Sequence, residues 1–340
     1  MNSKQRVMGL LTDKKVDRIP CFSGMGNVTK TGLQELGYGF SETHTSATKM
    51  ARFSASTYKL FNFESTVVPF DVGLEAEAMG CEMNFYEGRE GIIYPTVRSK
   101  IIDLSTDLEK AVPPGIERRG RVPMVVETIE IIKDDVGGEV AVGAYVLGPF
   151  TLAGQVMELN ELLMASFKEP AKVQAVLNKL ADVIIFIAGE FEKAGVDFLT
   201  IREMGASSDV ISPRMFKNLV MPPLVRTIEN ISPPGILHIC GNTDPIIEMM
   251  NECGADALSV EQRSDVKGIR EKLGSDPIIL GNIDPFNVLV KGTPDDVRDA
   301  VKRAIDDGVN GVMPGCDIWP EVPPENMKAM VEATAEFGGL

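Results

Sequence analysis

One helix-to-strand joint occurs three times in this chain. In each copy a helical pattern is followed by glycine, one small apolar residue, an aspartate or asparagine, and an apolar run. The three copies lie at 192–197 (EKAGVD), 251–256 (NECGAD) and 305–310 (IDDGVN). Glycine after the last helical turn favours the left-handed conformation that ends an α-helix. Three such joints indicate βαβ units with parallel strands.

The helix before the third joint can be predicted residue by residue. Thr293 suits the N-cap, Pro294 suits the first helical position, and Gly308 suits the end of the helix. The apolar face between them consists of Val297, Ala300, Val301, Ala304 and Ile305. This spacing has the 3.6-residue period of an amphipathic helix.

Eight apolar runs are candidate strands. They lie at 18–22, 66–70, 140–147, 198–201, 236–239, 257–260, 277–280 and 311–313. Eight strands separated by helical segments favour α/β architecture closed into a (β/α)8 TIM barrel. We expect an N-terminal helical extension, and we interpret the Gly- and Pro-rich segment 81–122 as a hairpin excursion after the strand at 66–70. The prediction is one domain over 1–340.

Composition and charge narrow the class of protein. The chain is 44% hydrophobic, which is enough to bury a large core without disulfides. No apolar run reaches the roughly 18 residues that span a bilayer, and the first residues do not resemble a signal peptide. We therefore expect a cytoplasmic protein with reduced cysteines. A formal net charge of −15 argues against a nucleic-acid partner.

Catalytic residues of a TIM barrel lie at the carboxyl ends of its strands. The polar and thiol residues that follow the predicted strands are Asn27, Asp71, Arg202, Glu203, His238, Cys240, Asn242, Glu261, Asn282, Asp284 and Cys316. The candidates for contacting substrate are Asn27, Asp71, Arg202, Asn242 and Asn282. Residues 24–30 match neither a dinucleotide nor a Walker phosphate loop, so we expect a flexible loop over the barrel mouth.

Three of these residues have the chemistry of zinc ligands. The two-residue period of a strand places His238 and Cys240 on one face, with Ile239 turned towards the helices. Cys316, which follows the last strand after a glycine, can reach across the mouth. Three protein ligands leave a fourth position open for substrate, as in catalytic zinc sites. The alternative is that all three are packed core residues, because their spacing is too long for a self-contained motif.

Other residues carry simpler expectations. Glu261 is the candidate catalytic residue, as a base or as a displaceable fourth zinc ligand; the alternative is a solvated acid or a partner for Arg263. His44 is expected at the surface. The remaining cysteines, expected to be buried as small apolar residues, are Cys21, Cys81 and Cys253.

Three motifs together resemble the uroporphyrinogen decarboxylase superfamily and, within it, the methylcobalamin:coenzyme M methyltransferases. They are Arg-Ile-Pro at 18–20, Gly-Asn-Ile-Asp-Pro at 281–285, and His238-x-Cys240 with the distant Cys316. The resemblance covers nearly the whole chain. It implies zinc on these three ligands and transfer of a methyl group from a methylated corrinoid, methylcobalamin, to the thiol of coenzyme M. A separate small corrinoid-carrying protein would dock at the barrel mouth.

The chain departs from the decarboxylases of that superfamily in one respect. Those enzymes carry arginines after the first strand to hold a substrate with many carboxylates, whereas residues 21–28 (CFSGMGNV) contain none. A polyanion would enter an acidic protein without counter-charges, so we do not expect decarboxylation. The sulfonate of coenzyme M needs a cation or a helix N-terminus, and Arg202 is a candidate. Two alternatives stay open: a corrinoid:tetrahydrofolate methyltransferase, and a non-catalytic, zinc-stabilised partner of a corrinoid protein.

Overall fold

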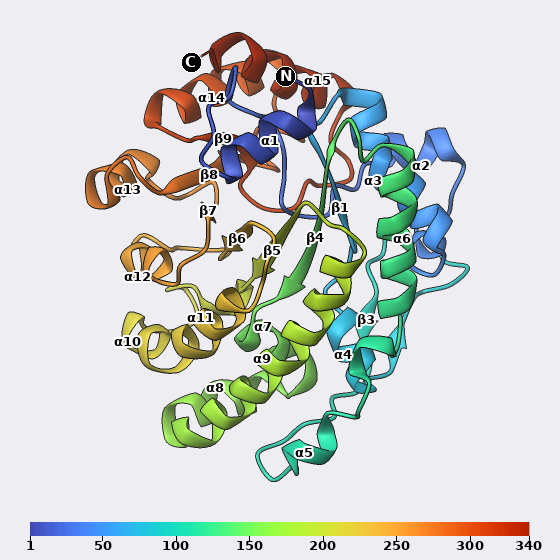
Figure 1. Ribbon diagram of the computed structural model, residues 1–340, viewed down its shortest axis with the longest axis vertical. Helices are drawn as coiled ribbons and strands as arrows, with labels where there is room; N and C mark the ends of the chain where they lie inside the picture. The colour runs from blue at the N-terminus through green and yellow to red at the C-terminus, as the bar shows by residue number, and fades with distance from the viewer. Residues whose placement is uncertain (340) are drawn as a thin grey trace.

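The computed structural model describes residues 1–339. Seven parallel strands form one curved sheet in the order β1-β4-β5-β6-β7-β8-β9, with helices around it (Figure 1). The strands are β1 Ser65–Val68, β4 Ala141–Leu147, β5 Phe198–Arg202, β6 Gly235–His238, β7 Ala257–Ser259, β8 Ile278–Ile283 and β9 Gly311–Pro314. The predicted hairpin within 81–122 is confirmed as an antiparallel pair, β2 Met83–Asn84 and β3 Thr96–Val97.

The helices follow the strands in the alternation expected of a TIM barrel. They are α1 Ser3–Leu11, α2 Lys30–Leu36, α3 Ala47–Phe61, α4 Leu74–Met79, α5 Leu108–Ala111, α6 Val122–Asp135, α7 Pro149–Val156, α8 Leu159–Lys168, α9 Pro170–Lys193, α10 Pro213–Met215, α11 Met221–Glu229, α12 Ile247–Glu252, α13 Val266–Leu273, α14 Pro294–Asp307 and α15 Pro324–Phe337. Shorter helical turns are η1 Ser41–His44, η2 Ile116–Arg118, η3 Met204–Ala206 and η4 Phe216–Val220. In the described chain, none of these helices has the length and apolarity to cross a membrane.

The three joint glycines have the predicted backbone. Gly195, Gly254 and Gly308 have φ values of 89°, 82° and 105°. Thr293 caps α14, and its hydroxyl accepts the backbone N–H of Asp296, whose side chain in turn accepts the N–H of Thr293. The local signals for these helix ends are therefore confirmed.

The prediction of a regular strand at 18–22 is wrong. Only Cys21 pairs with β9, through an isolated parallel bridge to Val312. On its other side, the carbonyl of Cys21 accepts the N–H of Glu64 at 3.0 Å, directly before β1. The segment therefore closes the ring between β9 and β1, but Pro20 lacks the N–H that a longer ladder needs.

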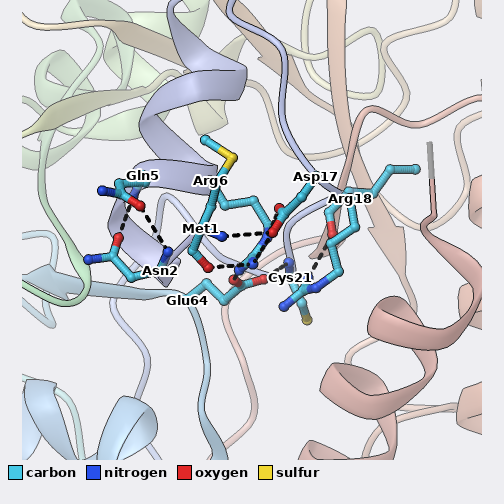
Figure 2. A network of polar contacts seen from close by, with 9 residues as sticks. Met1, Asn2, Gln5, Arg6, Asp17, Arg18, Cys21 and Glu64 are labelled. Carbon is cyan, nitrogen blue, oxygen red and sulfur yellow. Dashed lines mark hydrogen bonds and ion pairs between the residues drawn. The ribbon is translucent and has the colours of Figure 1, made fainter.

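A buried ion network joins the predicted N-terminal helix to the amino end of the barrel (Figure 2). Glu64 is inaccessible to solvent and pairs with Arg6 of α1 and with Arg18, whose Nη1 lies 2.9 Å from Oε2. The same Oε2 accepts the backbone N–H of Cys21 at 2.8 Å. Asp17 contacts the other side of the Arg6 guanidinium at 2.7 Å. The Arg18 side chain of the first family motif thus supports the barrel floor.

Two apolar cores separate the inside of the barrel from its helical shell. The inner core consists of Val7, Leu11, Phe22, Met25, Val67, Ala141, Tyr145, Phe198, Ile236, Ala257, Leu280 and Met313. Ile236 of β6 enters this inner core, whereas Leu237 of β6 and Ile239, directly after the strand, enter the outer one. The two-residue period therefore turns His238 inwards, as predicted.

Residues 24–29 are packed into the barrel and do not form the expected flexible loop over its mouth. All six are buried, and Met25 belongs to the inner core. A Cβ atom on Gly24 would lie 2.4 Å from the Thr200 hydroxyl, and one on Gly26 would lie 2.8 Å from the Pro69 carbonyl oxygen. The two glycines serve close packing, which composition alone does not distinguish from mobility.

Candidate metal centre

Neighbouring strands bring the predicted polar residues to one end of the barrel. In the register of the parallel strands, Arg202 at the end of β5 is paired with His238 at the end of β6. His238 is in turn paired with Ser259 at the end of β7. These three positions are therefore adjacent around the mouth. Cys240 and Glu261 each follow two residues after these strands end.

The predicted zinc ligands come together. One potential ligand atom from each of His238, Cys240 and Cys316 lies within 4.8 Å of the other two. The two Sγ atoms are 3.7 Å apart. One imidazole and two thiols form a donor set that suits zinc and leaves a fourth tetrahedral position free.

Close backbone packing allows Cys316 to cross the mouth. A Cβ atom on Gly315 would lie 2.4 Å from the backbone nitrogen of Gln262, which follows β7. The Gly315 N–H donates to the carbonyl of Ile283 at the end of β8, at 2.8 Å. Glycine is therefore required here for close approach.

Ser259 orients the histidine ring, a contact that sequence inspection missed. Its hydroxyl lies 3.0 Å from His238 Nδ1, whereas His238 Nε2 is buried and has no partner among residues 1–339. A neutral imidazole that donates from Nδ1 presents its Nε2 lone pair to a metal. The free Nε2 is an observation that fits a metal at this place. The signal for Ser259 was its matching position on the next strand.

The thiols of Cys240 and Cys316 form a hydrogen bond with each other, with their Sγ atoms 3.7 Å apart. The contact between the two Sγ atoms, in which either thiol can be the donor, lowers the pKa of Cys240, and the same contact together with burial raises the pKa of Cys316. The contact thus favours the thiolate form of Cys240, which is the form that binds a soft metal.

Glu261 lies beside the three ligands and is firmly held. Its Oε2 is 3.9 Å from Cys240 Sγ and accepts the Gly241 N–H at 3.1 Å, while its Oε1 pairs with Arg263. Glu261 is therefore the partner of Arg263, as the alternative expected, but it is buried and is not a solvated acid. Its role as a base or as a zinc ligand stays a prediction.

A cavity of about 440 Å³ opens next to Cys316. Its walls are formed by Phe70, Asp71, Val72, Tyr94, Pro95, Arg202, Met204, Cys316, Asp317, Ile318, Trp319 and Pro320. Two of the predicted substrate residues, Arg202 and Asp71, are among them. The cavity is mostly apolar with a few charged groups, which is typical of a site for a small molecule.

His44 is not a surface residue, contrary to expectation. It is fully buried, and its Nδ1 lies 2.9 Å from Asp71 Oδ2. Arg121 donates to both oxygens of Asp71, at 2.8 and 3.0 Å. Burial raises the pKa of Asp71, but Arg121 and His44 outweigh it, so this pKa lies below its usual range. The burial of His44 depends on partners 27 and 77 residues away, which local sequence does not reveal.

The three asparagine candidates lie at different depths. Asn282 donates to the carbonyl of Ser264 at 3.1 Å and supports the loop that carries Glu261. Asn242 is exposed, and its N–H donates to Asp209 at 2.9 Å. Asn27 is buried, and its amide has no partner among the described residues. Their contact with substrate remains a prediction.

Comparison with known proteins extends over nearly the whole chain. A methylcobamide:CoM methyltransferase of Methanosarcina barkeri is 31% identical over 340 residues, covering 98% of this chain and 98% of the relative. A uroporphyrinogen decarboxylase of Trichormus variabilis is 25% identical over 301 residues, covering 84% and 83% of the two chains.

Solved structures show the same fold. A methyltransferase from Methanosarcina mazei has a TM-score of 0.93 at 31% identity, covering 99% of both chains. A B12-independent methionine synthase from Shewanella has a TM-score of 0.61 at 16% identity, covering 94% and 98%, and shares the fold alone. The uroporphyrinogen decarboxylase (URO-D) family model matches residues 2–337. The chain therefore belongs to the uroporphyrinogen decarboxylase family, as its motifs predicted.

Proposed function

We propose that this protein is a zinc-dependent methyltransferase that moves a methyl group from a methylated corrinoid to the thiol of coenzyme M. The convergence of His238, Cys240 and Cys316 within 4.8 Å, beside a cavity, carries this proposal. The methylcobamide:CoM methyltransferase of M. barkeri matches more of the chain, at higher identity, than the decarboxylase does. A zinc ion on the three ligands would make a bound acceptor thiol a thiolate near neutral pH.

The residues of the chain prepare the acceptor for attack. Ser259 fixes the His238 ring, Arg202 offers a cation to the sulfonate, and the apolar cavity walls exclude water. The thiolate sulfur bonds to the methyl carbon while the carbon–cobalt bond breaks, and the electron pair of that bond remains on cobalt. In this proposal Glu261 receives the proton of the thiol, and its position 3.9 Å from Cys240 Sγ supports that role.

The methyl donor would arrive on a small corrinoid-carrying protein that docks at the barrel mouth. Tyr94 and Trp319 line the cavity and are 36% and 49% exposed, so they would meet the incoming corrinoid. We place this reaction in the cytoplasm, on a single domain spanning 1–340, with no nucleic acid involved.

Methyl transfer tests the proposal directly. We expect the enzyme to convert methylcob(III)alamin to cob(I)alamin when coenzyme M is added, which the corrinoid absorption spectrum reports. We expect no decarboxylation of uroporphyrinogen, because residues 21–28 contain no arginine and Arg18 is held by Glu64. Transfer to tetrahydrofolate but to no thiol would favour the alternative methyltransferase class, and zinc without any transfer would favour a non-catalytic partner.

Replacing Glu261 tests the route of the proton. A thiol with a pKa near 8.5 releases its proton when its sulfur binds zinc. The Glu261→Gln variant should keep the metal. If Glu261 takes up that proton in the unaltered protein, the variant should release up to about one more proton to the buffer for each thiol bound. Calorimetry in buffers of different ionisation enthalpy counts these protons. X-ray absorption provides the decisive check, since a zinc shell that gains no sulfur from the thiol would contradict the activation mechanism.

A further inference from the structure

The cavity beside Cys316 contains an ion pair whose two members differ in burial. The Arg202 side chain is 3% exposed, whereas that of its partner Asp317 is 40% exposed. Among residues 1–339, Asp317 has no other hydrogen-bond donor or cation on its carboxylate. The carboxylate can therefore turn into solvent by breaking one contact.

The arginine, in contrast, is buried and has two further contacts, although its Nε has no hydrogen-bond partner among the described residues. Its guanidinium lies over the Tyr145 ring, 4.6 Å from the centroid, and its Nη2 lies 3.4 Å from Met204 Sδ. The Tyr145 hydroxyl is fixed in turn by the Asp71 carbonyl at 2.8 Å. Arg202 thus stays in place when Asp317 leaves. A buried guanidinium without an anion is unfavourable, so another anion must then take the position.

We propose that Asp317 is a displaceable counter-ion and that the anionic end of the acceptor exchanges with it on Arg202. For the identity of the acceptor this inference rests on the proposed function. Arg202 and Cys316 line the same cavity, so an acceptor with its anion on Arg202 can extend its sulfur towards the metal ligands. The acceptor class is then a short thiol that carries a sulfonate or carboxylate.

Asp317 is on this basis a specificity-determining residue. A neutral thiol supplies no anion, so it leaves the Arg202–Asp317 pair intact and forms no ion pair with Arg202 that would strengthen its binding. An anionic thiol forms an ion pair with Arg202, but it must first displace the Asp317 carboxylate. Removing the charge of Asp317 therefore strengthens the binding of anionic acceptors in particular.

Binding of ethanesulfonate tests the anion position without a thiol, so the result does not depend on zinc or on methyl transfer. Calorimetric titration should show that Asp317→Asn binds ethanesulfonate roughly three- to tenfold more tightly than the unaltered protein, the range of one partly exposed ion pair. Arg202→Gln should lose detectable binding. Glu336→Gln removes one negative charge from an exposed ion pair between α14 and α15, and this variant should bind ethanesulfonate as the unaltered protein does.

Kinetics with two acceptors then tests specificity. Asp317→Asn should lower the KM for coenzyme M more than the KM for 2-mercaptoethanol, so that the ratio of the two changes roughly three- to tenfold. Equal changes for both thiols, or ethanesulfonate binding that neither Asp317→Asn nor Arg202→Gln alters, would overturn the inference. If no thiol is methylated at all, the proposed function fails, and the ethanesulfonate titration still decides whether the anion position exists.

Discussion

Cys316→Ala should lower the affinity for zinc by at least about 100-fold and abolish methyl transfer to coenzyme M. Loss of a residue that merely orients a ligand costs about 10–100-fold in metal affinity, and Cys316 would be a ligand itself. Only His238 and Cys240 would remain of the group whose atoms lie within 4.8 Å of one another. Metal analysis of the purified variant, compared with about one zinc per chain in the unaltered protein, gives the result.

A second cysteine provides the matched control for this substitution. Cys81 is buried among apolar side chains and is not part of the three-residue group. Cys81→Ala also removes one thiol group, but at a position away from the three ligands, so this variant should retain zinc and activity. The metal assignment would be wrong if Cys316→Ala kept its zinc, or if the unaltered protein transferred methyl groups while free of zinc.

Asp71→Ala should lower the free energy of unfolding by about 3–5 kcal/mol, because it leaves buried charge without its partner. Arg121 would lose two hydrogen bonds, of 2.8 and 3.0 Å, and keep only the Glu77 carboxylate and a 3.3 Å contact to the His44 carbonyl. His44 would lose its one side-chain partner among the described residues. Unfolding in urea measures the change. The exposed pair of Glu336 with Arg298 provides the comparison, since Glu336→Gln should cost no more than about 1 kcal/mol.

This result also separates two roles for Asp71. A stable Asp71→Ala protein that no longer binds coenzyme M would assign the residue to substrate contact, as the sequence suggested. A destabilised protein would show that its carboxylate mainly joins η1, which ends at His44, to Arg121 at the start of α6. The four hydrogen bonds that the Asp71 carboxylate accepts favour the second outcome.

Features that depend on neighbours along the chain could be predicted from the sequence. Glycines after helices, the capping of α14 by Thr293 and the inward face of β6 each follow from contacts within a few residues. For that reason the barrel and the placing of His238 and Cys240 on one face could be predicted. The position of Cys316 followed from its place after the last strand and from the resemblance to a known family.

Which side chains meet across the barrel depends on the tertiary fold and could not be predicted from local sequence. Three contacts join residues that are far apart along the chain. Ser259 contacts His238 across 21 positions, Asp317 contacts Arg202 across 115, and Asp71 contacts the buried His44 across 27. No local period encodes such distances, because they depend on how strands register and loops fold over the mouth. The segment 18–22 shows the same limit: its apolar pattern predicted a strand, but the segment makes only a single bridge to β9, because Pro20 lacks the N–H that a longer ladder needs.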